Sequence, residues 1–129
     1  MQTQMIVMLT VAVLQPDKDN PRQLTDDAEF RRELELLGQD MQQRGVLCSA
    51  ITHGENPIEF RDQSETGAIP VENIAPADTT GAGDVLHGAF CFGLAEGLAF
   101  QPALAYAAAI ATFSCRFHGT REWMRHFSR

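Results

Sequence analysis

The first half of the chain alternates between apolar blocks and polar breaks. Residues 5–14 are almost all apolar and rich in β-branched side chains, a pattern typical of a buried strand. A helix is predicted next, because four apolar residues recur at steps of four, three and four: Phe30, Leu34, Leu37 and Met41. Residues 25–27 offer N-caps for this helix, and Gly45 lies just past its end. Residues 46–52 then predict a second buried strand.

A strand, a helix and a buried strand in that order predict a parallel β–α–β unit. Weaker strand patterns follow at residues 58–60 and 68–71, and small apolar residues then predict helices at 84–98 and 102–117. Six alanines make the last helix a close-packed and largely buried one: Ala103, Ala105, Ala107, Ala108, Ala109 and Ala111. The pattern therefore predicts an α/β chain, organised as a single domain over residues 1–129.

Composition and charge exclude several classes of protein. The 129 residues are 44% hydrophobic and 21% charged, which is ordinary for a globular chain and unlike a disordered tail, a fibrous repeat or a disulfide-dense scaffold. The net charge of −7 argues against a nucleic-acid partner, because phosphate backbones are bound by clustered Lys and Arg. A small anionic ligand stays open, since backbone N–H groups hold phosphate without a positive net charge.

The cysteines and the N-terminal apolar block bear on location. Cys48, Cys91 and Cys115 are odd in number and widely spaced, which is typical of reduced and mostly buried thiols rather than of disulfides or a zinc site. The apolar block is too short to span a bilayer, and no Lys or Arg precedes it as in a secretory signal. We therefore expect a cytoplasmic protein with no membrane partner.

The candidate chemistry lies in residues 78–84, which read Asp-Thr-Thr-Gly-Ala-Gly-Asp. Gly81 and Gly83 let the backbone turn tightly and align successive N–H groups, and a positive φ is expected at Gly83. A helix that begins near residues 82–84 adds its positive N-terminal end, so the N–H groups would form an anion hole for a transferring phosphoryl group. Asp84 beside that hole could accept the proton of an attacking hydroxyl. This apparatus suits phosphoryl transfer to an alcohol.

Two other phosphate-binding motifs are excluded. No Lys follows the glycines as in a P-loop, and Gly88 lies five residues after Gly83 rather than the three of the dinucleotide fingerprint. The alternative is purely structural: a glycine-rich loop in which Asp84 is only a favourable charge in the first turn of a helix. His87, one turn after Asp84, either approaches the substrate or packs against a helix, and packing is the favoured interpretation. The other histidines show no metal-ligand spacing: His53, His118 and His126.

The motif at residues 78–84, followed by Gly88-Ala89-Phe90, resembles the C-terminal signature of the ribokinase/PfkB family of carbohydrate kinases. Thr52-His53-Gly54 resembles the T-x-G turn of that family, and residues 117–121 resemble the glycine turn after its last helix. The resemblance covers residues 46–123 and, less securely, residues 5–43. It implies a ribokinase-like α/β fold, here a partial doubly wound parallel sheet flanked by helices.

The resemblance also implies roles for individual residues. The implied site comprises the catalytic base Asp84, the anion hole Gly81, Ala82 and Gly83, the nucleotide contacts Thr52 and Gly54, and the loop for a monovalent cation, Asp78 and Thr80. ATP, Mg²⁺ and K⁺ are the implied cofactors, and no metal site made by the protein alone is predicted. The implied activity is ATP-dependent phosphoryl transfer to the hydroxyl of a sugar or a sugar-like compound.

The chain departs from the family pattern in its first third. Residues 1–44 carry no counterpart of the family's sugar-binding residues or lid sheet, and no copy of its Asn/Glu motif is found. The chain thus resembles the C-terminal portion of a sugar kinase, and the alternative is a non-catalytic remnant that binds nucleotide or phosphate or serves to oligomerise. Without an N-terminal half, a strand edge and apolar helix faces would be uncovered, so we expect a homo-oligomer or a partner chain over the missing half.

Overall fold

The computed structural model describes residues 6–10, 27–52 and 54–128, which fold as two compact units. The first unit comprises the described residues up to Gly54 together with Ile58–Ala68, and the second comprises Glu55–Pro57 and the described residues from Ile69 onward. The expectation of a single domain over residues 1–129 stays a prediction.

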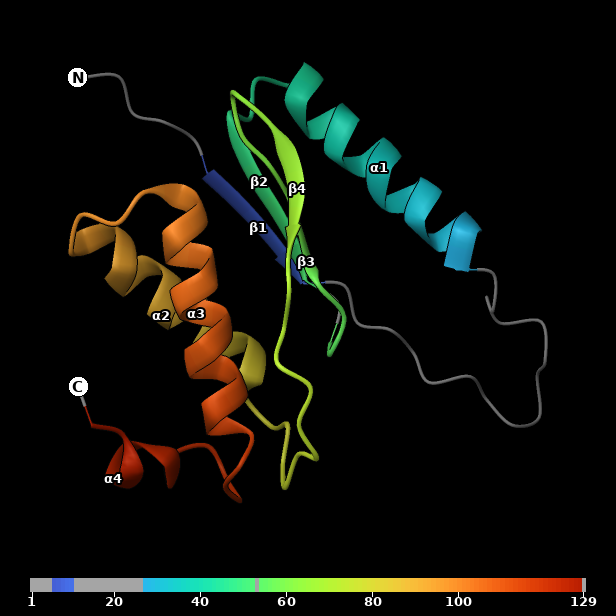
Figure 1. Cartoon of the computed structure of the whole chain (residues 1–129). Coiled ribbons are helices and arrows are strands. Elements are labelled where there is room, and N and C mark those ends of the chain that lie inside the picture. The colour runs from blue at the N-terminus through green and yellow to red at the C-terminus, as the bar shows by residue number, and fades with distance from the viewer. Residues whose placement is uncertain (1–5, 11–26, 53, 129) are drawn as a thin grey trace. The chain divides into compact units, whose positions relative to one another are not determined.

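The first unit is a small sheet with one helix beside it (Figure 1). Its elements are β1 (Ile6–Thr10), α1 (Asp27–Gln43), β2 (Cys48–Thr52), β3 (Ile58–Arg61) and β4 (Thr66–Ile69). The strand order is β1-β2-β3-β4, and β1 and β2 run parallel with Ile6 opposite Cys48. The predicted parallel β–α–β unit is confirmed, although residues 5 and 11–14 of the predicted first strand lie outside the described residues.

The pairing after β2 changes direction. β3 is antiparallel to β2, with Ala50 opposite Phe60, so the sheet is mixed. All five residues of β2 are buried. Residues of β3 alternate between buried and half-buried, which is the pattern of a strand whose two faces differ in exposure. The β3–β4 turn is closed by Asp62, whose Oδ1 accepts N–H bonds from Ser64 and Glu65 at 2.8 and 2.9 Å.

The α1 helix ends where the sequence pattern predicts. Gly45 follows its last turn with φ +85°, a left-handed conformation that glycine adopts without strain. Met41 of the predicted apolar stripe is buried and Leu37 is half-buried, and the side chains of Phe30 and Leu34 lie outside the described residues. Gly38 of α1 is buried and lies against the side chain of Arg61 of β3. A Cβ added at Gly38 would lie only 2.5 Å from the Arg61 Nε, so no larger residue fits there without a shift.

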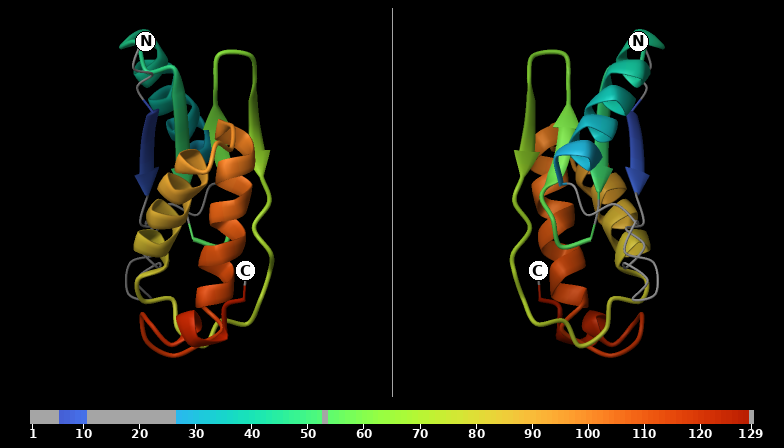
Figure 2. Two further views of the ribbon diagram at one scale, coloured as in Figure 1. Left: turned by 90° about the vertical axis from the view of Figure 1, so that its left-hand side faces the viewer. Right: turned by 90° about the vertical axis from the view of Figure 1, so that its right-hand side faces the viewer.

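The second unit is a packed pair of helices followed by a short third helix. Its elements are α2 (Ala82–Ala95), α3 (Phe100–Ser114) and α4 (Trp123–His126), and Figure 2 shows α2 and α3 side by side. Small residues let these helices approach, since a Cβ added at Gly93 would lie 3.4 Å from the Cβ of Ala103. Leu104 is fully buried in this core. The two predicted C-terminal helices are therefore confirmed, each beginning two residues earlier than expected.

Two further observations concern the surface. Cys48 and Cys115 are buried free thiols as expected, but Cys91 is exposed on α2, so the prediction of burial is wrong at that position. Among the described residues, no helix is long and apolar enough to cross a membrane. The α/β class predicted from the sequence pattern is confirmed by the sheet of the first unit and the helices of the second.

Candidate functional site

The candidate anion hole lies where the loop of residues 79–81 enters α2. Gly81 is the N-cap of α2 with φ +77°, and its carbonyl accepts the N–H of Val85 at 3.0 Å. The N–H of Ala82 is bonded to the carbonyl of Thr79 at 3.2 Å. The next N–H groups, those of Gly83 and Asp84, belong to the first helical turn and have no carbonyl one turn earlier in the helix to bond. They are placed to receive an anion, as at other helix N-termini.

The glycine that needs a left-handed backbone is Gly81, not Gly83. Gly83 has no positive φ and lies inside α2, and a Cβ added there would meet nothing within 4 Å. The expectation of a positive φ at Gly83 is therefore wrong, because the helix begins one residue before it. At Gly81 an added Cβ would lie 3.1 Å from the Cγ2 of Thr120. The tight turn therefore lies just before α2, and the Thr120 side chain packs against it.

Asp78 fastens this loop to the turn that follows α3. Its Oδ1 accepts the N–H of Thr80 at 2.9 Å, and its Oδ2 accepts the N–H of Gly119 at 2.8 Å. A hydrogen bond from the Thr80 side chain, followed by those from the N–H groups of Gly119 and Thr80, lowers the pKa of Asp78 from 3.8 to about 2. The carbonyl of Cys115 also accepts the N–H groups of Ala77 and Asp78. The loop is thus tied to a segment about 40 residues away in the sequence.

Asp84 and His87 both lie on the exposed side of α2. Asp84 is the acidic residue of the first turn, and its side chain is open to solvent beside the anion hole. His87 is also exposed, and its Nδ1 donates to the carbonyl of Gly83 at 2.7 Å. The prediction that His87 packs against a helix is therefore wrong. Its ring instead bonds to the backbone of the first turn, next to Asp84.

The other predicted site residues belong to the first unit. Thr52 is the last residue of β2 and is buried, and Gly54 follows with φ +62° in an exposed turn. The positive φ explains why a glycine stands there. The structure brings Asp78, Thr80 and Gly81–Asp84 together in the second unit, and Thr52 and Gly54 lie in the first.

Within the described part of the chain, no three His, Cys, Asp or Glu side chains gather into a metal site, so the residues do not form a magnesium site of their own. Asp78 stays ionised, as a cation ligand must, and both of its oxygens already accept N–H bonds. A K⁺ ion at this loop would therefore share Asp78 with the turn at Gly119 and would have to draw further ligands from carbonyl oxygens.

A model of the pfkB family of carbohydrate kinases matches residues 10–126. The chain belongs to the pfkB carbohydrate kinase family. Relatives of known name include the ribokinase of Bacillus subtilis, 40% identical over 68 residues, and the ribokinase of Lactococcus lactis, 33% identical over 78 residues. These matches cover 52% and 60% of this chain but only 23% and 26% of the relatives. This chain thus matches about a quarter of the length of either ribokinase.

Solved structures share its ribokinase-like fold. The ribokinase of Thermotoga maritima is similar to this chain with a TM-score of 0.65 and 27% sequence identity. The match covers 70% of this chain and 30% of the Thermotoga maritima chain. The adenosine kinase of Sinorhizobium meliloti matches 90% of this chain and 32% of its own, with a TM-score of 0.61 and 24% identity. A ribokinase II from E. coli, solved with ATP and Mg²⁺, has a TM-score of 0.59 and 22% identity over 74% of this chain and 31% of its own. The ribokinase-like fold class is therefore confirmed.

Proposed function

We propose that this chain binds ATP at the start of α2 and takes part in transferring its γ-phosphoryl group to a hydroxyl of a sugar or sugar-like compound. The observation that carries the proposal is the exposed Asp84 carboxylate in the first turn of α2, directly after the Gly81 turn. Membership of the carbohydrate kinase family supports this reaction class. The substrate beyond a sugar-like alcohol is left open by the proposal.

In the proposed reaction, backbone N–H groups hold the charge that develops on the phosphoryl group. Those of Gly83 and Asp84 point out of the N-terminal end of α2, where the helix dipole favours an anion. Gly81 supports them through its carbonyl, which accepts the N–H of Val85 and so fixes where the helix begins. Preorganised donors of this kind need no rearrangement when the charge appears, which is why they stabilise a transition state more than water does.

Asp84 acts as the general base in this proposal. Its carboxylate takes the proton of the acceptor hydroxyl while that oxygen forms a bond to the γ-phosphorus, and the bond from phosphorus to the bridging oxygen of ADP breaks. An exposed carboxylate suits this role, because a substrate can reach it. Thr52 and Gly54 are proposed to line the nucleotide site, and Asp78 and Thr80 to accept K⁺.

The metal and the partner are part of the same proposal. Mg²⁺ would arrive with the phosphates of ATP, which is how proteins commonly bind it, and the ribokinase II of E. coli was solved with both. The three free thiols suit the reducing cytoplasm. The proposed partner is a second copy of the chain or a different chain.

The second candidate is a chain that binds nucleotide or phosphate without turnover, or that serves to oligomerise. The lack of sugar-binding residues in residues 1–44 favours it. Turnover separates the candidates, because only a kinase needs the carboxylate of Asp84. In both the kinase and the nucleotide-binding remnant, the anion hole should still bind the phosphates of ATP.

The test combines calorimetric titration with Mg-ATP, a screen of sugars for ADP release, and light scattering on the same sample. We expect Asp84→Asn to abolish turnover and to leave ATP affinity within about threefold of the wild type. Glu96→Gln is the matched control, since Glu96 is an exposed carboxylate at the opposite end of α2.

Each outcome decides between the candidates. A full rate in Asp84→Asn would refute Asp84 as the base. ATP binding without turnover on any sugar would favour the non-catalytic candidate. The absence of ATP binding at millimolar concentration would refute the proposed function, and a monodisperse monomer at micromolar concentration would refute self-association.

A further inference from the structure

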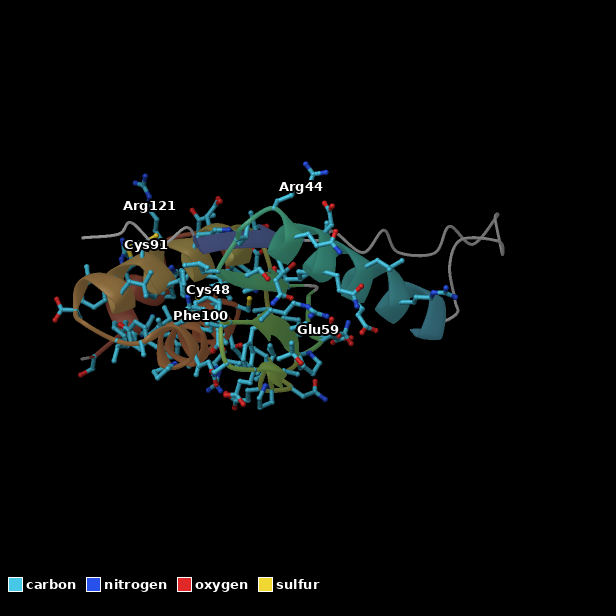
Figure 3. The ribbon with its side chains drawn as sticks, turned by 90° about the horizontal axis from the view of Figure 1, so that it is seen from above. Arg44, Cys48, Glu59, Cys91, Phe100 and Arg121 are labelled. Atoms are coloured by element: carbon cyan, nitrogen blue, oxygen red, sulfur yellow. The ribbon has the colours of Figure 1, made fainter. Side chains whose placement is uncertain are left out.

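The second unit contains three described arginines, and they differ in their partners. Arg116 donates to Glu72 at 3.0 Å, and Arg125 lies 3.4 Å from a carboxylate oxygen of Glu122. Arg121 has no carboxylate partner among the residues that the structure describes. Its side chain extends from the ribbon into solvent (Figure 3). The positive charge of Arg121 is therefore available to a ligand, whereas those of its two neighbours are engaged.

The backbone just before Arg121 is fixed against the candidate anion hole. Gly119 donates its N–H to Asp78 at 2.8 Å, and the Thr120 side chain packs on Gly81. On its other side, the Thr120 carbonyl accepts the indole N–H of Trp123 at 3.0 Å. Thr120 is held between these contacts, so Arg121 begins directly beside the loop that enters α2. The backbone position of Arg121 is set by these contacts, and its side chain is exposed.

The charge around the loop makes a cation useful there. Asp78 and Asp84 both lie at this loop, and the chain as a whole carries a net charge of −7. A nucleoside triphosphate that approaches Asp84 meets this negative field, and N–H groups alone supply only partial positive charges. A guanidinium offers a full charge and a planar pair of donors that match two phosphate oxygens.

We propose that Arg121 is a phosphate-binding residue whose guanidinium closes onto the β- and γ-phosphates of the nucleotide bound at the start of α2. This inference rests on the proposed function, because it places Arg121 at the same site. It adds a residue that the sequence motif does not include and that lies 37 positions after Asp84. The phosphate chain of ATP is then held from two sides: by N–H groups of α2 and by a side chain from the turn after α3.

The test measures affinity for nucleotides that differ in the number of phosphates. We expect Arg121→Ala to weaken ATP binding by about tenfold, as for the loss of a hydrogen-bonded ion pair to phosphate. The loss should shrink from ATP to ADP to AMP, and it should diminish as salt is raised. Arg121→Lys should recover part of the affinity, because it keeps the charge but not the bidentate geometry.

Arg125→Ala is the matched control, since Arg125 is an exposed arginine four residues later that is paired with Glu122. Its ATP affinity should stay within twofold of the wild type, a bound that we set as the criterion of no effect. Calorimetry on the full chain gives the affinities, and the emission of Trp123, the single tryptophan, gives an independent signal beside the turn.

Three results would overturn the proposal, and they can be told apart. If the wild type binds ATP and Arg121→Ala binds it equally well, the role of Arg121 is refuted and the proposed function stands. If the wild type binds no ATP, the proposed function fails and the role of Arg121 falls with it. Equal losses for ATP and AMP would also overturn it, because an effect that ignores phosphate number is not a contact to the β- and γ-phosphates.

Discussion

The turn at Gly81 allows a sharp test of which glycine in the motif shapes the loop. Gly81 has φ +77°, whereas Gly83 two residues later lies within α2. Replacing each in turn by alanine adds the same methyl group at positions only two residues apart. We expect Gly81→Ala to destabilise the second unit and Gly83→Ala to leave it unchanged or slightly stabilised.

The magnitudes follow from the local geometry. A left-handed backbone costs an L-residue roughly 1–2 kcal/mol, and the new Cβ at residue 81 would also crowd the Thr120 Cγ2 at 3.1 Å. At Gly83 the Cβ meets nothing within 4 Å, and alanine is favoured over glycine in a helix by up to about 1 kcal/mol. The two variants should therefore differ by about 2 kcal/mol in the free energy of unfolding.

The assay is urea unfolding followed by the emission of Trp123. Trp123 lies in the same unit as both glycines, so its signal reports the part of the chain that the substitutions perturb. A difference of about 2 kcal/mol corresponds to roughly 1 M in the urea midpoint for a chain of this size. If Gly81→Ala unfolds at the same midpoint as Gly83→Ala, the reasoning from the positive φ is wrong.

Three further predictions concern stability and reactivity. The pKa of Asp78 is about 2 in the folded chain, compared with an ordinary value of 3.8. The stability that the Asp78 carboxylate contributes is therefore present above about pH 4 and is lost as the pH falls toward 2. Asp78→Asn should reduce the pH dependence of unfolding in that range, as measured by circular dichroism. Leu104→Ala should cost about 2–5 kcal/mol in urea unfolding because Leu104 is fully buried, whereas the exposed Met124→Ala should change stability by less than about 0.5 kcal/mol. Cys91 should react with a thiol reagent much faster than the two buried cysteines, whose pKa values are raised by burial, and Cys91→Ser should abolish the fast phase.

The sequence predicted the elements well where a single pattern decides them. The apolar spacing of residues 30–41 and the glycine at 45 located α1, because a helix needs one buried stripe and a left-handed residue after its end. The order of strand, helix and strand predicted the parallel pair β1 and β2. The antiparallel β3 was not predicted, since a four-residue strand carries no signal for the direction of its partner.

The sequence motif defines the candidate site, but the internal geometry of that site could not be predicted from the sequence. The motif alone located Gly81–Asp84, yet it could not tell which glycine needs the positive φ, because that depends on where α2 begins. Exposure of His87 and Cys91 likewise depends on which face of α2 meets α3, and the composition of α2 is apolar on both sides. The glycine turn at residues 117–121 was predicted, but the hydrogen bond from the Gly119 N–H to Asp78 was not, because the two residues lie about 40 positions apart in the sequence.

The contacts divide the motif into two parts with different tasks, which explains its length. The Asp78 carboxylate anchors the loop, because it accepts the N–H groups of Thr80 and Gly119. Gly83 and Asp84 begin the helix and leave N–H groups and a carboxylate directed outward. Gly81 joins the parts, since its left-handed turn reverses the chain between them. The proposed anion hole keeps its geometry only if the preceding loop is anchored, so loss of the Asp78 bonds should loosen it.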